Sequence, residues 1–147
     1  MSATDVAEDG ILSLLITNAD FANIGDAGGL LGSVGAGVFW SSLHSATPAD
    51  TGTQGTSEAT YSPYARVSIA RSVTGWTVTS GVADNDSAIT FAACTSGTTN
   101  ASSFGLGTSS SGTTGILVLY GDLTAVLAIS NGITPSFAAG ALDITLT

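Results

Sequence analysis

The stretch Leu142-Asp143-Ile144-Thr145-Leu146-Thr147 shows the fold class most clearly. Its three aliphatic residues alternate with polar ones. A period of two is typical of a β-strand that buries one face and leaves the other in water. The segment therefore predicts a strand with its aliphatic side chains in a core.

Seven segments upstream share this character, because they are short and rich in Val, Ile, Thr and aromatic residues. They are Val38–Leu43, Ala65–Arg71, Val73–Ser80, Ala88–Ala93, Ser103–Gly107, Gly115–Gly121 and Val126–Ser130. Turn signals separate them at Asp84-Asn85-Asp86, Ser96-Gly97, Ser111-Gly112, Asn131-Gly132 and Ala139-Gly140. Short strands at this spacing predict a mainly β protein, an antiparallel β-sandwich or barrel of jelly-roll-like type.

One α-helix is expected, from Asp5 to about Asn23, with Asp5 and Glu8 at the spacing of a capping box. We expect residues 1–24 to form an N-terminal helix or arm and residues 25–147 a single β-domain. Six glycines fall within Gly25–Gly37, which predicts a flexible loop. Residues 46–62 are polar and predict a second, long exposed loop.

The charge of the chain excludes several classes of partner. There are no lysines and two arginines against eleven carboxylates, a formal net charge of −9. Such a chain repels phosphate backbones and anionic membrane surfaces, so neither nucleic acid nor a membrane is expected as a partner. Only 9% of the residues are charged, against about 25% in ordinary soluble domains. A surface this poor in charge favours burial against protein, and we expect a symmetric homo-oligomer, a trimer above all.

The residues that carry chemistry do not combine into a site. His44 is the one histidine, with no nucleophile elbow in the chain, and is expected on the surface at a strand end. Cys94 follows an apolar segment and is expected in the core. Asp84-Asn85-Asp86 lacks the rest of a calcium loop and is expected to be a hairpin turn. The glycines of Gly35-Ala36-Gly37 and Gly105-Leu106-Gly107 do not complete a dinucleotide fingerprint. We therefore predict no catalytic, cofactor-binding or metal-binding residues, and no enzyme.

The order of several short motifs resembles a family of small tailed-bacteriophage proteins that are labelled tail fibre or minor structural proteins. The motifs are Leu43–Asp50, Tyr64-Ala65-Arg66, Ile89-Thr90-Phe91, Phe104-Gly105, Leu119–Thr124 and Phe137–Leu146. They cover most of the chain from about Gly10. The glycine-rich stretch is longer than the family pattern, and Gly107-Thr108-Ser109 replaces its usual Asp-Ala pair.

The resemblance implies a structural virion protein that acts by binding its neighbours. We favour a capsid decoration, or cement, protein on the outer capsid surface, because the chain shows no repeat, coiled coil or shaft. Its expected partners are the major capsid protein and copies of itself. The alternative is a tail-associated fibre or receptor-binding protein, and a virion-borne carbohydrate hydrolase is a more distant third. Gly25–Gly37 and Ala46–Ser62 are the expected contact loops, and Trp76 and Phe91 are expected in the core.

Overall fold

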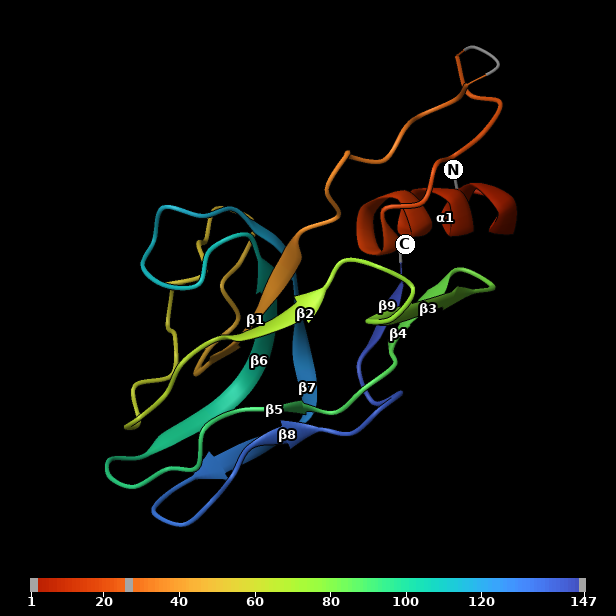
Figure 1. Cartoon of the computed structure of the whole chain (residues 1–147). Helices are drawn as coiled ribbons and strands as arrows, with labels where there is room; N and C mark the ends of the chain where they lie inside the picture. Colours follow the sequence, from red (N-terminus) through yellow and green to blue (C-terminus); the bar gives the residue numbers. More distant parts are fainter. Residues whose placement is uncertain (1–2, 26–27, 146–147) are drawn as a thin grey trace. The chain divides into compact units, whose positions relative to one another are not determined.

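The computed structural model describes residues 3–25 and 28–145, which form antiparallel β-sheets and one N-terminal helix, as predicted (Figure 1). These residues form two compact units, each assembled from segments that are distant in sequence. Unit 1 comprises Met1–Val38, Ala70–Ala88 and Phe137–Thr147; unit 2 comprises Phe39–Ile69 and Ile89–Ser136. The domain boundary expected at residue 24 stays a prediction.

Unit 1 is a helix packed on a three-stranded sheet. Helix α1 (Asp5–Leu12) continues into a π-helical turn, η1 (Ser13–Thr17), and both contact strand β3 (Trp76–Thr79). The sheet has the order β3-β4-β9, with β4 at Val82–Asn85 and β9 at Asp143–Thr145. The buried apolar residues of the unit are Leu12, Ile16, Trp76, Ala83, Leu142 and Ile144. The alternation predicted for residues 142–145 is confirmed, while Leu146 lies outside the described residues.

The helical segment ends at Thr17, earlier than the predicted Asn23, and a guanidinium group binds its last carbonyls. Asn18 follows Thr17 with a left-handed φ of 61°. The Arg71 side chain donates to the carbonyl oxygens of Leu14 and Leu15, at 2.5 and 2.6 Å. These carbonyls lie in the last turn, where a helix has no internal partners for them. The predicted capping box is also wrong, because Thr4 is the N-cap and no side chain caps the helix.

The predicted hairpin turn at Asp84-Asn85-Asp86 is wrong. Asp84 and Asn85 belong to β4, where they pair with Thr77 and Trp76 of β3. The turn is the dipeptide Ser80-Gly81, and both of its residues have positive φ, 53° and 77°. Two such residues make the turn that matches the twist of a two-residue hairpin. The other four predicted turns do lie between strands.

Asn85 occupies a strand because its side chain serves a neighbouring turn. The residue is buried, and its amide nitrogen donates to the carbonyl oxygens of Ser87 and Ala138, each at 2.8 Å. Its amide oxygen accepts from the backbone N–H of Leu142 at 2.9 Å. A buried amide must satisfy its donors and acceptors. Asn85 therefore fixes the turn that leads into β9.

Unit 2 is built on a four-stranded sheet of order β2-β1-β6-β7. The bounds are Val67–Ala70 for β2, Val38–His44 for β1, Thr99–Gly107 for β6 and Leu117–Ile129 for β7. Strand β7 unites two segments that were predicted to be separate. Ala101 pairs with Leu127 and Ser103 with Asp122, so residues 123–126 bulge from the ladder opposite a single residue of β6. The predicted break between Gly121 and Val126 falls at this bulge, where Asp122 and Thr124 interrupt the apolar run.

A two-stranded sheet joins β5 (Ile89–Thr90) and β8 (Ser136–Phe137). Phe91 follows β5, and its N–H donates to the Pro135 carbonyl at 2.9 Å. Its ring is buried, as predicted, and stacks on Tyr64 with a centroid distance of 6.1 Å. Phe91 therefore contributes to the core of unit 2 from just beyond a strand.

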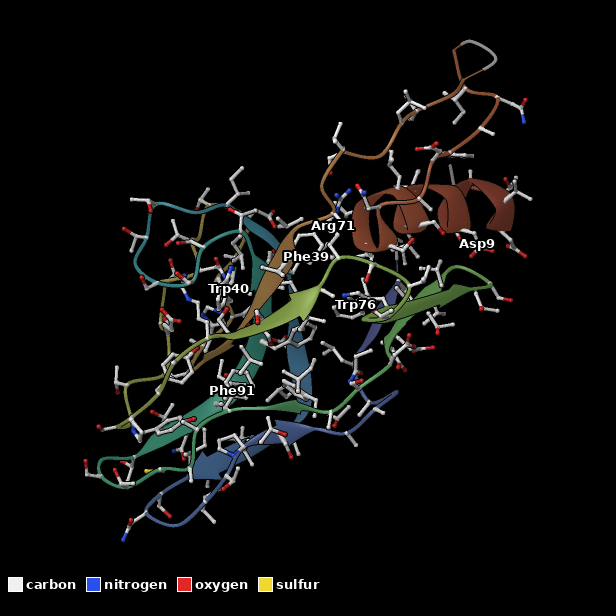
Figure 2. All side chains as sticks on the ribbon, viewed as in Figure 1. Asp9, Phe39, Trp40, Arg71, Trp76 and Phe91 are labelled. Atoms are coloured by element: carbon white, nitrogen blue, oxygen red, sulfur yellow. The ribbon has the colours of Figure 1, made fainter. Side chains whose placement is uncertain are left out.

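Trp76→Ala tests the core of unit 1, where the indole is 1% exposed (Figure 2). Removing a buried aromatic ring of this size is expected to lower the free energy of unfolding by about 3–5 kcal/mol. Urea unfolding followed by circular dichroism measures the loss. Val73→Ala, at an exposed valine nearby in the sequence, is the control and should stay within about 0.5 kcal/mol of the parent. An unchanged midpoint for Trp76→Ala would show that this core is wrongly described.

Candidate protein-interaction site

His44 is fully buried, so its predicted surface position is wrong. Its Nδ1 lies 2.8 Å from the Thr56 carbonyl oxygen, which can only accept, so Nδ1 carries the proton. Its Nε2 then accepts from the Ser42 hydroxyl at 2.9 Å. Desolvation by burial lowers the pKa of His44 and keeps the ring neutral. A serine hydroxyl beside a histidine is also the arrangement of a catalytic nucleophile and its base. Here both residues are 0% exposed, and the pair has a structural role, because His44 ties β1 to the loop that contains Thr56.

The other residues considered for chemistry also have structural positions. Cys94 is buried, as predicted. A Cβ at Gly105 would lie 2.8 Å from His44 Nε2, and one at Gly107 would lie 2.1 Å from the Gln54 Cδ, so these glycines make room for buried side chains. Across residues 3–25 and 28–145, no three His, Cys, Asp or Glu residues gather as a metal site. In the same residues, no helix is long and apolar enough to span a bilayer.

The loop formed by residues 46–62 is anchored in unit 2, which corrects the prediction of a long exposed loop. Gln54, near its middle, is fully buried. Its amide nitrogen donates to the Trp40 carbonyl at 2.8 Å, and its amide oxygen accepts from the Ser109 N–H at 3.1 Å. The polar composition that predicted exposure therefore serves a buried hydrogen-bond network.

A buried ion pair lies at the centre of this network. The Arg66 guanidinium donates through Nε and Nη2 to the two carboxylate oxygens of Glu58, both at 2.7 Å. It also donates to the carbonyl oxygens of Ser109 and Gly112 at 2.9 and 2.7 Å. The Tyr64 hydroxyl donates to the same carboxylate. Two loops, residues 46–62 and 108–115, are thus held by one guanidinium.

Arg71 plays the corresponding part in unit 1 (Figure 2). Besides the helix carbonyls, it donates to Asn18 Oδ1 at 2.6 Å, to the Ser33 hydroxyl at 2.9 Å and to the Ala36 carbonyl at 3.3 Å. The second expected contact loop, 25–37, is therefore held near its end, whereas Asp26 and Ala27 lie outside the described residues. Leu31 and Val34 of this loop are exposed.

The outer edge of the anchored loop meets strand β7. The Thr47 and Ser103 hydroxyls donate to Asp122, and these bonds lower the pKa of its carboxyl. The Tyr120 hydroxyl donates to Asp50, and this bond to a carboxylate raises the pKa of Tyr120. We call the exposed and half-buried side chains of β7, together with neighbouring loop residues, the β7 surface; along the strand they alternate between the two faces of the sheet. It consists of Thr47, Asp50, Ile116 and the exposed or half-buried residues 117–128.

The β7 surface is the best candidate for a binding site because it is apolar and solvent-accessible. Ten of the thirteen residues of β7 are aliphatic or aromatic, yet only Ile129 is buried. Ile116 and Val126 are 69% and 61% exposed. Exposed apolar patches of this kind mark interaction sites. The sequence predicted the strand segments but not this surface, because the hydrophobicity of a segment does not reveal whether its side chains are exposed or buried in the fold.

Comparison with known proteins identifies the family of this chain. The model of the family described as Podophage GP4 fiber I protein gp80 matches residues 36–145, about three quarters of the chain. The match includes every strand of both units and leaves out α1 and η1. No curated protein matches the chain.

Glu58→Gln tests the buried ion pair. The substitution keeps the shape of the side chain but leaves the Arg66 guanidinium buried without its counter-charge. We expect the free energy of unfolding to fall by about 3 kcal/mol, as measured by urea unfolding. Asp5→Asn, an exposed carboxylate in the first turn of α1, is the matched control and should cost less than about 1 kcal/mol. Equal effects of the two substitutions would contradict a structural role for the pair.

The buried imidazole predicts a pH dependence. The folded pKa of His44 lies below its unfolded value of 6.5, so the unfolded state binds more protons as the pH falls below about 6.5. The contribution of His44 is therefore fully present above that pH and is lost on acidification. Because His44 is the chain's one histidine, its imidazole NMR signal gives the pKa directly. A folded-state value of 6.5 or higher would overturn the described burial.

Proposed function

Because the chain belongs to the Podophage GP4 fiber I protein gp80 family, we propose that it is a fibre subunit of a tailed-phage particle that acts by binding other proteins. The family identifies a virion component with a fibre-like label. This supports the tail-associated alternative from the sequence better than the preferred capsid decoration. The match over residues 36–145 is the single observation that carries the proposal.

The structure supports a binding role in preference to a catalytic one. The serine–histidine pair is buried, whereas the apolar β7 surface is open to solvent. The Arg66 network holds two loops of unit 2, the unit that carries this surface, so a partner meets a largely pre-formed shape. Pre-organisation of this kind lowers the entropy that a binding surface loses on association. Neither hydrolysis nor a cofactor is needed for such a role.

Attachment to the particle and contact with further copies are the two interactions that a fibre subunit requires. The major capsid protein, expected as a partner from the sequence, becomes one candidate attachment point among the virion proteins. A location on the outer capsid surface is the competing proposal, and the two differ in copy number. A decoration protein occupies the repeated sites of the shell, whereas a fibre occupies a few attachment points.

Particles that lack the protein test this proposal. If it is a fibre or receptor-binding subunit, such particles should lose adsorption to host cells but keep the heat stability of the parent. Quantitative mass spectrometry of purified virions should find far fewer copies than of the major capsid protein. Release of DNA at lower temperature with normal adsorption, together with a copy number near that of the capsid protein, would instead establish the decoration role.

A further inference from the structure

Strand β9 is three residues long and lies at the edge of the sheet in unit 1, beside β4 (Figure 1). It is antiparallel to β4, and its cross-strand pairs are Val82 with Thr145, Ala83 with Ile144 and Asp84 with Asp143. Ile144 is the buried residue of the strand and belongs to the core of the unit. The attachment of β9 to β4 therefore decides whether Ile144 stays in that core.

One of these three pairs places two carboxyl groups directly opposite each other. The Cβ atoms of directly opposite residues in an antiparallel sheet are about 5 Å apart, so the side chains of Asp84 and Asp143 meet. Two like charges at such a position destabilise the pairing of the strands. A single proton reverses this effect, because a protonated carboxyl group donates a hydrogen bond to the neighbouring carboxylate.

The charged groups of unit 1 around this pair do not neutralise it. Asp86 lies just beyond β4, and Thr77, which is opposite Asp84 on β3, donates its hydroxyl to Asp86 at 2.6 Å. Strand β3 and the turn η1 contain no charged residue. Helix α1, which packs on β3 and β4, contributes three further carboxylates, those of Asp5, Glu8 and Asp9. Arg71 is the one Lys or Arg of unit 1, and it is bound to the end of the helical segment and to the glycine-rich loop.

From this register and the surrounding charge, we propose that the Asp84–Asp143 pair is a pH-sensitive attachment of strand β9. One proton shared by the two carboxyl groups joins β9 to β4, and loss of that proton leaves two carboxylates that repel each other and loosen the strand. The attachment concerns unit 1 alone and does not depend on the role proposed for the protein in the virion.

The direction of the pH dependence follows from the titration of Asp84. Desolvation by burial, the hydrogen bond to Asp143 and the charges of Asp143 and Asp86 all raise the pKa of Asp84 above its ordinary value of 3.8. A group whose pKa is raised on folding contributes stability below its unfolded pKa, and this contribution is lost as the pH rises through the folded pKa. Acid therefore strengthens the attachment of β9 in unit 1, whereas it weakens the contribution of His44 in unit 2.

The titration of Asp84, followed by NMR of its carboxyl carbon in the whole chain, tests the shared proton. The parent protein should show a pKa above 3.8, and Asp143→Asn should lower it, because the substitution removes the opposing charge and keeps the shape of the side chain. Asp5→Asn, at an exposed carboxylate in the first turn of α1, is the matched control and should leave the pKa of Asp84 unchanged. A pKa of Asp84 at or below 3.8, or one that Asp143→Asn does not lower, would overturn the proposal.

Hydrogen exchange tests whether this proton holds the strand. Protection of the amides of residues 143–145, corrected for intrinsic exchange and compared with that of β3, should fall roughly two- to fivefold from about pH 4.5 to pH 7 in the parent chain. Asp143→Asn should abolish this fall, and Asp5→Asn should keep it. Protection in β9 that does not change with pH, or a fall that persists in Asp143→Asn, would show that the pair does not control the strand.

Discussion

The Arg66–Glu58 ion pair is the constraint on which the loops of unit 2 depend. A guanidinium removed from water must have its charge and its donors matched, or its burial becomes very costly. Glu58 supplies the counter-charge through two parallel bonds, and Ser109 and Gly112 supply carbonyl acceptors. The positions of two loops therefore follow from the demands of one side chain. Bidentate geometry also explains why lysine, a point charge with flexible donors, would not substitute here.

Arg71 applies the same principle to unit 1 with a different set of acceptors. It bonds the carbonyls of Leu14 and Leu15, which the end of the helix leaves without partners, and it also bonds residues of the glycine-rich loop. The two arginines of the chain therefore both hold loops in place within their own units. The strongly acidic character of the chain follows from its composition, eleven carboxylates against two arginines, and neither arginine is left as a free surface cation.

The sequence predicted the strands and the core aromatic residues better than the tertiary contacts of individual side chains. Period-two alternation at residues 142–145 and the apolar character of Trp76 and Phe91 depend on local pattern, and both predictions were confirmed. Asp84-Asn85 was misassigned because Asn85 satisfies a turn that lies distant in sequence, a contact that no local pattern reveals. His44, and Gln54 as part of the loop 46–62, were expected at the surface because polar residues are mostly exposed. Their burial depends on partners brought together by tertiary structure. The same limit applies to the β7 surface, since a hydrophobic strand in a sequence gives no indication of what covers it.

The placement of the two arginines also governs how the folded chain meets digestive enzymes. Trypsin-like proteases cleave after lysine or arginine, and this chain has no lysine. Arg66 is buried, and Arg71 has its guanidinium bound to five acceptors. Cleavage at either site requires the backbone to open and enter a protease groove, so it reports loss of the local structure. For a component carried outside a cell, the hydrogen-bond networks that shape the loops also protect both cleavage sites.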